Sequence, residues 1–334
     1  MSDRREDPPP GTSLGSWKGL VPICVAAAAA VFVGAGVDVV RSHQRAAKEE
    51  RKAETAADSA ETRPRFIVGV TESGNALVVR DVETGAGVGL PVAAPEDRRF
   101  HRVAAVKDGS YIVASYADRK VTFQRLRLGK EGRPKELQDI PDLSVPGVST
   151  KWSDLAVTPD GDRIAYVTYK GARSRVDVVS TATGDRQVWT TKSTGRVGSL
   201  SWSGAKLSFV WSPVRSVDGK LKETKHEVRT LDTGGATGDL RLSKAVMDLP
   251  KGSTTAVRVD LGIVVGTVKD SQLALQLYTL EGRPGEVLWR QTVNSDLTDL
   301  DAAPGGKIFL ATAGDLYPEG ARSVSGDDLA DATW

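Results

Sequence analysis

The sequence predicts an all-β domain built from repeated four-stranded sheets and preceded by one transmembrane helix. Three observations lead to this fold class. Gly19 to Val37 form 19 residues without a charge, close to the roughly 20 that cross a bilayer as a helix. From about Arg65 onward, short β-branched and aromatic runs alternate with Gly, Asp and Pro turns, as in a β domain. The same order of strands and turns then recurs at regular intervals.

The chain divides into four segments of different composition. We expect a disordered polar tail, a transmembrane helix, a solvated stalk rich in Ala, Glu, Lys and Arg, and the β domain, at residues 1–18, 19–40, 41–64 and 65–334. The apolar run is longer than the core of about 7–15 residues in a cleavable signal peptide. We therefore expect a retained anchor that places the protein in the cell membrane.

Small residues on one face of the predicted helix suggest a second role for it. Ala26, Ala30 and Gly34 are spaced by four, so a second copy of the helix could approach closely and form a homodimer. Cys24, the only cysteine, also lies in this segment. It excludes an intrachain disulfide framework and a thiolate metal cluster.

The charges that flank the apolar run bear on membrane orientation. Three basic residues precede it and five follow it closely. Counted literally, this excess places the large domain in the cytoplasm. Long domains, however, translocate largely regardless of such charges. The charge count therefore leaves both orientations open.

The repeated unit begins with a tight hairpin between two apolar strands. Such hairpins lie at residues 103–115, 155–167, 200–211 and 300–312. Asp-Gly and Gly-Gly turns provide the positive φ angles that these connections need. A later turn in each unit is marked by Gly85, Gly132, Gly184, Gly234 and Gly285, at intervals of 47, 52, 50 and 51 residues. Spacing of this regularity indicates stacked supersecondary units.

A unit of this length holds four short strands, and a closed radial array protects their edges. The sequence therefore predicts a β-propeller. We count three strands at 66–92, four in each unit between about 100 and 292, and at least two after Asp296. This count allows five or six blades. We favour six, with the N- and C-terminal strands sharing one closing sheet.

The hairpin Thr158-Pro159-Asp160-Gly161-Asp162-Arg163-Ile164-Ala165-Tyr166 resembles the repeats of TolB-like and WD40-type β-propellers. The chain is also similar to the extracytoplasmic propellers that Gram-positive bacteria attach to a single membrane helix. This resemblance covers roughly residues 65–325 and implies an extracytoplasmic domain. The Gly-His and Trp-Asp signature of true WD40 repeats is absent, and the short N-terminal tail leaves no room for an anti-sigma segment.

The sequence offers no catalytic, cofactor or metal motif. Gly11 to Gly15 match G-x-S-x-G but lie in the polar tail instead of at a strand-to-helix turn. His43, His101 and His226 have no partner at ligand spacing, so we interpret them as surface residues. The 45 basic and 43 acidic residues nearly balance, which argues against a nucleic-acid partner. We expect no enzyme activity and no cofactor.

Two irregular segments are the best candidates for a binding site. Residues 137–151 join one blade to the next, and residues 213–226 interrupt another blade. In a propeller, both kinds of loop emerge on the same face, where binding often resides. The candidate residues for binding a protein partner are Arg215, Lys220, Lys222, Lys225 and His226; a solvated insertion is the alternative. Five tryptophans, at 152, 189, 202, 211 and 289, are assigned to strands and to packing between blades.

The leading hypothesis is a non-enzymatic, membrane-tethered propeller that acts as a sensor or protein-interaction scaffold, outside the cytoplasm. One alternative is an extracytoplasmic hydrolase or lyase that uses carboxylates around the central channel. It requires at least two inward-facing acidic residues close together. Another alternative is a scaffold that faces the cytoplasm, as the charge count suggests. Because a fold does not specify a function, these alternatives stay open at the level of sequence.

Overall fold

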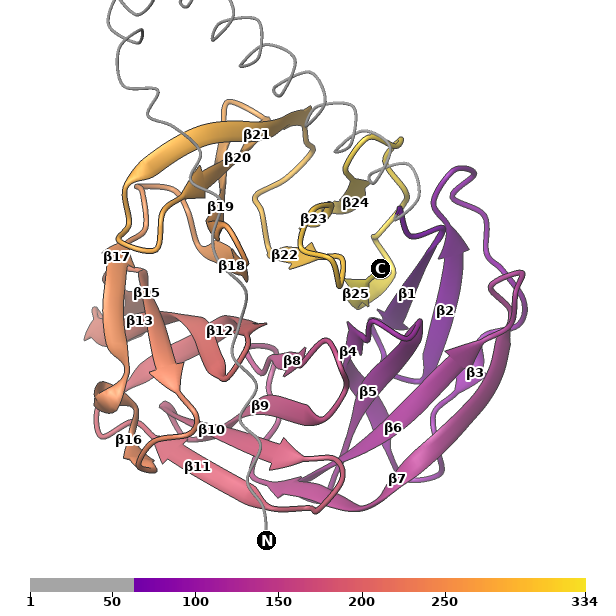
Figure 1. The fold of residues 1–334 in the computed structure, drawn as a ribbon, viewed down its shortest axis with the longest axis horizontal. Helices are drawn as coiled ribbons and strands as arrows, with labels where there is room; N and C mark the ends of the chain where they lie inside the picture. Colours follow the sequence, from indigo (N-terminus) through magenta and orange to yellow (C-terminus); the bar gives the residue numbers. More distant parts are fainter. Residues whose placement is uncertain (1–62) are drawn as a thin grey trace, which may run out of the picture. The chain divides into compact units, whose positions relative to one another are not determined.

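The computed structural model describes residues 63–334, in which six β-sheets follow one another around a central axis (Figure 1). The predicted tail, membrane helix and most of the stalk lie outside the described residues. Within residues 63–334 no helix has the length and apolarity needed to cross a bilayer. The sheets are the blades of a β-propeller, and their number confirms the preferred count of six.

From the central axis outward, the first three blades contain the following strands. Blade 1 contains β25 (Leu329–Thr333), β1 (Phe66–Thr71), β2 (Ala76–Asp81) and β3 (Val92–Ala93). Blade 2 contains β4 (Arg99–Ala105), β5 (Ser110–Ala117), β6 (Lys120–Leu128) and β7 (Pro134–Pro146). Blade 3 contains β8 (Leu155–Val157), β9 (Arg163–Lys170), β10 (Arg173–Ser180) and β11 (Arg186–Thr190), with β16 (Gly238–Asp239) at its outer edge.

The other three blades continue the ring. Blade 4 contains β12 (Gly195–Ser203), β13 (Lys206–Val217), β15 (Glu227–Asp232) and β17 (Lys244–Asp248), and β14 (Lys220–Glu223) pairs with the end of β13. Between β16 and β17 lies the 3₁₀ turn η1 (Leu240–Leu242). Blade 5 contains β18 (Thr255–Val259), β19 (Gly262–Lys269), β20 (Gln272–Tyr278) and β21 (Pro284–Thr292). Blade 6 contains β22 (Asp299–Ala302), β23 (Phe309–Ala313) and β24 (Asp315–Pro318).

The ring closes as the sequence predicts, because strands from both ends of the described chain share blade 1. β25 pairs antiparallel with β1, from Val68 opposite Thr333 to Thr71 opposite Leu329. The predicted hairpins also form. Gly109 and Gly161 sit in the turns of two of them, with φ angles of 78° and 77°, a region that residues with a side chain rarely adopt.

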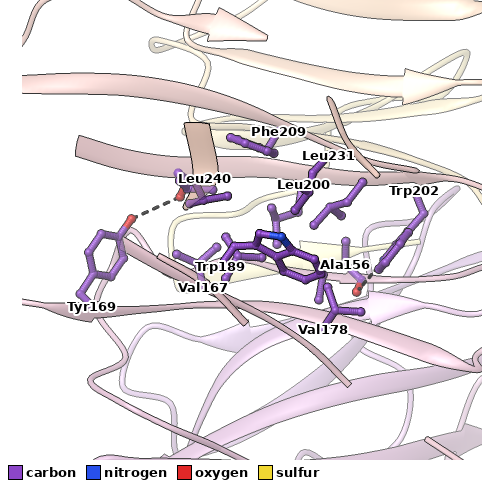
Figure 2. Packing of buried hydrophobic residues seen from close by; sticks show 14 residues of the cluster. Ala156, Val167, Tyr169, Val178, Trp189, Leu200, Trp202, Phe209, Leu231 and Leu240 are labelled. Carbon is purple, nitrogen blue, oxygen red and sulfur yellow. Dashed lines mark hydrogen bonds between the residues drawn. The ribbon is translucent and has the colours of Figure 1, made fainter. Parts of the chain in front are cut away.

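The core consists of apolar layers between adjacent blades. Between blades 3 and 4, Trp189 is fully buried among residues of both sheets (Figure 2). Its indole nitrogen donates to Ala236 O at 3.0 Å, and that of Trp202 donates to Ala156 O at 3.2 Å. Each indole thus buries its rings while its N–H group remains paired. The prediction of packing between blades is right for these two tryptophans.

The two irregular segments differ from the expectation. Residues 137–146 belong to β7, the outermost strand of blade 2, and only residues 147–154 connect to blade 3. The pairing moves from Gln124–Asp139 to Thr122–Ser144, so a bulge absorbs the residues between. Leu143 within the bulge and Val145 after it are buried, and this burial holds the strand in the sheet. Residues 213–226 contain a β-hairpin, because β13 extends past its sheet and β14 folds back on it.

Candidate functional site

Side chains, and not backbone ladders, join the innermost strands of neighbouring blades in the described chain. Asp331 on β25 accepts a hydrogen bond from Val103 N of blade 2 at 2.7 Å. Asp154, just before β8, accepts one from Leu200 N of blade 4 at 2.7 Å. Similar bonds link Ser201 to Arg258 N and Asp301 to Thr333. Within residues 63–334, the innermost strand of each blade has no further strand on its axial side. These acceptors therefore pair with polar groups on that edge.

Arg102 fixes the connection between blades 2 and 3. Its guanidinium donates to Ser153 O at 2.6 Å and to Lys151 O at 2.8 Å. It also lies 3.8 Å from Asp331 Oδ1. Because these partners occupy the guanidinium, Arg102 positions the connection more than it offers charge to a ligand.

Four partly buried aspartates gather around the axis: Asp154, Asp299, Asp301 and Asp331. Burial raises the pKa of Asp301 to about 6. Burial also raises the pKa of Asp331 to about 7, against the opposing charge of Arg102. Burial, with the charge of Asp331 nearby, holds the pKa of Asp299 well above its ordinary value. The cluster therefore retains protons near neutral pH, because one guanidinium cannot balance four carboxylates.

Asp299 differs from the other three aspartates in its partners. Its Oδ1 accepts a hydrogen bond from the adjacent Leu300 N at 2.9 Å. In the described chain it forms no hydrogen bond to another blade, whereas the other three each bond to a neighbouring blade. Asp299 is thus the carboxyl of the cluster that is best placed to meet a ligand.

A pocket of about 320 Å³ opens above this cluster at the mouth of the channel. Asp154, Asp299 and Asp331 form part of its lining, together with groups from the two irregular segments. Thr255 also lines it, and the Thr255 hydroxyl is buried without a hydrogen-bond partner. The prediction that both irregular segments contribute to one face is consistent with this lining.

Trp152 stands at the rim of the pocket. The sequence-based assignment of Trp152 to a strand is wrong, because it lies in the connection 147–154 and is 41% exposed. The guanidinium of Arg196 lies 3.9 Å from its ring centroid, and Lys151 Nζ lies 5.1 Å away. An exposed indole held by two cations is a common anchor in binding surfaces.

The β13–β14 hairpin continues the rim on the other side of Arg196. Glu223 forms an ion pair with Arg196, and its other oxygen lies 3.5 Å from His226 Nε2. Ser212 Oγ lies 2.7 Å from His226 Nδ1. His226 is thus a structured part of the pocket wall.

The structure divides the five candidate residues into two groups. Arg215, Lys220 and Lys222 are exposed on the β13–β14 hairpin and form no recorded ion pair in the described chain. Lys225 lies 3.6 Å from Glu227 and 3.5 Å from Asp248, and His226 belongs to the pocket. Only the first three are available as free cations.

His101 is not the surface residue that the sequence suggested. It lies on β4, and its Nδ1 is 3.3 Å from Tyr166 Oη. Burial, with the charge of Arg102 beside it, lowers the pKa of His101 to about 3. His101 is therefore neutral at physiological pH.

Sequence reasoning missed the aspartate cluster. Asp154-Leu155-Ala156 and Asp299-Leu300-Asp301 place an aspartate at the start of an innermost strand, and this repeated position was the available signal. No group of three or more His, Cys, Asp or Glu residues in 63–334 is arranged to hold a metal ion.

Comparison with known proteins assigns no family to this chain. No family model matches the sequence, and no curated protein matches it. Solved structures do match. One is a functionally unknown protein from Desulfotomaculum acetoxidans, at 11% identity and a TM-score of 0.47, covering 78% of this chain and 95% of that one.

Two further matches are named proteins. TolB from Acinetobacter baumannii shares 13% identity at a TM-score of 0.45, over 77% of this chain and 62% of that chain. A periplasmic gluconolactonase from Pseudomonas aeruginosa shares 14% identity at a TM-score of 0.45, over 80% and 98%. These similarities agree with the propeller fold and carry no argument about ligand or reaction.

Proposed function

We propose that this chain is a non-enzymatic, membrane-tethered propeller that binds a protein partner at the mouth of its central channel, outside the cytoplasm. One observation carries the proposal. The pocket at the mouth is bordered by the exposed Trp152 of the connection 147–154 and by the basic β13–β14 hairpin. A rigid ring that presents two such segments together is suited to recognition.

The hairpin supports a partner with an acidic segment. Arg215 lies directly opposite Lys222, and Val217 lies opposite Lys220. Cross-strand partners share a face of the hairpin, and so do residues two apart. Three cations therefore occupy one face, and the opposed pair of like charges costs stability. An acidic partner would remove this repulsion and gain charge-assisted hydrogen bonds.

A binding assay with a defined probe tests the proposal. The full-length protein is titrated into a fluorescently labelled glutamate-rich peptide, and anisotropy is recorded at low and high salt. Replacement of Arg215, Lys220 and Lys222 by Gln should weaken binding about tenfold or more, because a charge-assisted bond is lost at each site.

The matched control changes three exposed cations in turns at the other end of the blades, Lys107, Lys130 and Arg283, to Gln. It removes the same charge from the protein. If the control variant weakens peptide binding as much as the hairpin variant does, net charge accounts for the binding and the hairpin is not the site.

The tether and the orientation rest on the apolar run at 19–40 and on the resemblance to anchored propellers. Protease added to intact spheroplasts tests them. Digestion of the propeller supports an extracytoplasmic domain. Full protection would refute this orientation and favour the scaffold that faces the cytoplasm. Release of the protein without detergent would argue against the anchor.

A hydrolase or lyase is the second candidate, and the aspartate cluster is the observation that favours it. Asp299 and Asp331 are acidic groups near the axis with raised pKa values, as an acid–base pair requires. Asp331, however, also holds blade 2 through Val103. Assays with chromogenic esters and glycosides test this role. If the wild type turns over a substrate and Asp299→Asn abolishes that turnover, the enzymatic role is established. If the wild type gives no turnover above buffer, the enzymatic role loses its support.

A further inference from the structure

A second pocket, of about 460 Å³, lies between blades 2 and 3. Its walls come from the β5–β6 turn, the end of β7, the β9–β10 turn and the end of β11. Four of its lining residues are cationic, Arg119, Lys170, Arg173 and Arg175, and none is acidic. The connection 147–154 begins at this pocket and leads to the channel mouth, so the two pockets are separate but share one end of the ring.

Strand register explains why the cations converge. Arg173 lies opposite Lys170, and Arg175 lies opposite Thr168 on the next row of the β9–β10 hairpin. Arg175 also lies opposite Thr190 on β11. These residues therefore share one face of blade 3. Placing Arg173 directly opposite Lys170 costs stability unless an anion lies between them.

The carboxylate on this face, Asp177, is already paired with Arg175. Asp177 is fully buried, and both of its oxygens accept hydrogen bonds from Arg175, at 2.8 and 2.7 Å. Arg186 Nε lies 3.7 Å from the same carboxylate. Arg119, Lys170 and Arg173 have no recorded ion pair in the described chain. The pocket thus carries an excess of positive charge.

The backbone at Arg119 is strained. Arg119 has a φ angle of 62°, and Asp118 before it has 45°. Glycine is the favoured residue for such a turn, and a long side chain there costs stability. Only the Arg119 carbonyl is used structurally, as it accepts a hydrogen bond from Gly147 N at 2.8 Å. Within residues 63–334 the Arg119 guanidinium forms no ion pair that offsets this strain.

An unsatisfied hydroxyl completes the pocket. Thr168 is 1% exposed, and its Oγ1 has no hydrogen-bond partner. A buried hydroxyl without a partner is unfavourable in the empty protein. Because Thr168 lines the pocket beside Gly147, this hydroxyl is a donor next to the cations.

We propose that this pocket binds a phosphoryl group carried by a larger molecule. Arginine forks match the oxygens of phosphate, and three unpaired cations suit a dianion better than a single carboxylate. The volume exceeds that of a bare phosphate ion, so the rest of the ligand also occupies the pocket. The group can come from a soluble phosphomonoester or from a phospholipid headgroup.

Calorimetry on the full-length protein in neutral detergent tests the proposal. The probes are glycerol 3-phosphate, a water-soluble phosphomonoester, and dihexanoyl phosphatidic acid, a soluble phospholipid whose headgroup is also a phosphomonoester. Binding of the first alone indicates a soluble ligand, and binding of the second alone indicates a lipid. Either result supports the site if it depends on the pocket cations. Binding of neither probe would overturn it.

Arg119→Gly is the decisive variant. It removes the guanidinium, keeps the carbonyl bonded to Gly147 and relieves the strained backbone. We expect affinity to fall about tenfold or more while the unfolding temperature stays the same or rises. Arg173→Gln should weaken binding similarly. Arg283→Gln, in a turn at the other end of the blades, is the control. Unchanged affinity in both pocket variants would show that the probe binds elsewhere.

Discussion

Asp331→Asn tests the account of the aspartate cluster. The amide keeps an oxygen that can accept the hydrogen bond from Val103 N, so the change removes mainly the titrating charge. Burial raises the pKa of Asp331 from 3.8 to about 7 in the folded protein. Between these values the folded state holds a proton that the unfolded state has released. The contribution of Asp331 to stability is therefore full below pH 4 and is lost as the pH rises toward 7.

The expected magnitude follows from this linkage. Each pH unit in the window changes the free energy of unfolding by about 1.4 kcal/mol for one group. From pH 5 to pH 7, where Asp331 is half titrated in the folded protein, Asp331→Asn should therefore gain about 2 kcal/mol relative to the wild type. His101 titrates in the opposite sense, because its pKa is lowered to about 3. It is present in both proteins, so its contribution cancels in the difference.

Urea unfolding at pH 5, 6, 7 and 8 measures this difference. We expect the two stability curves to converge or cross as the pH rises, and to run parallel above pH 7. A difference that stays constant from pH 5 to pH 8 would refute the reasoning, because it would mean that Asp331 is ionised throughout.

Three other changes test the fold and the second pocket. Trp189→Ala should cost about 3–5 kcal/mol in urea unfolding, because it leaves a cavity between blades 3 and 4; a loss below about 1 kcal/mol would contradict the packing described. Deletion of residues 329–334 removes β25 and should abolish the cooperative thermal transition measured by circular dichroism. A retained transition would show that the ring closes without β25. Thr168→Val should stabilise the ligand-free protein by up to about 1 kcal/mol, since it removes an unpaired buried hydroxyl; a clear loss in calorimetry would indicate that the hydroxyl is satisfied.

The sequence was sufficient for the six-bladed propeller because local signals and the global fold agree. Apolar alternation and turn glycines each act over a few residues. Because these local signals recur at a regular interval, successive repeats reinforce the same fold. The closing sheet followed from strand counting. The error at residues 137–146 arose because Pro141 and Asp142 look like a loop, whereas a bulge accommodates them within β7.

The sites were less accessible to sequence reasoning because they depend on contacts between blades. Asp154 and Asp331 are about 180 residues apart in the chain, and a repeat pattern does not reveal that both meet near the axis. The hairpin cations were predicted because they are neighbours in sequence. Arg119 and Arg173 come from different blades, so their convergence became visible only in the pocket between those blades.

The position of β25 in the closing blade has a consequence for biosynthesis. Every other strand is made before β25, so the ring cannot close until the ribosome has passed residue 333. Until then, β1 presents an unpaired edge that can pair with other chains. A nonsense mutation only a few codons upstream of β25 would therefore be expected to yield a product open to aggregation and proteolysis, even though it would contain nearly the whole domain.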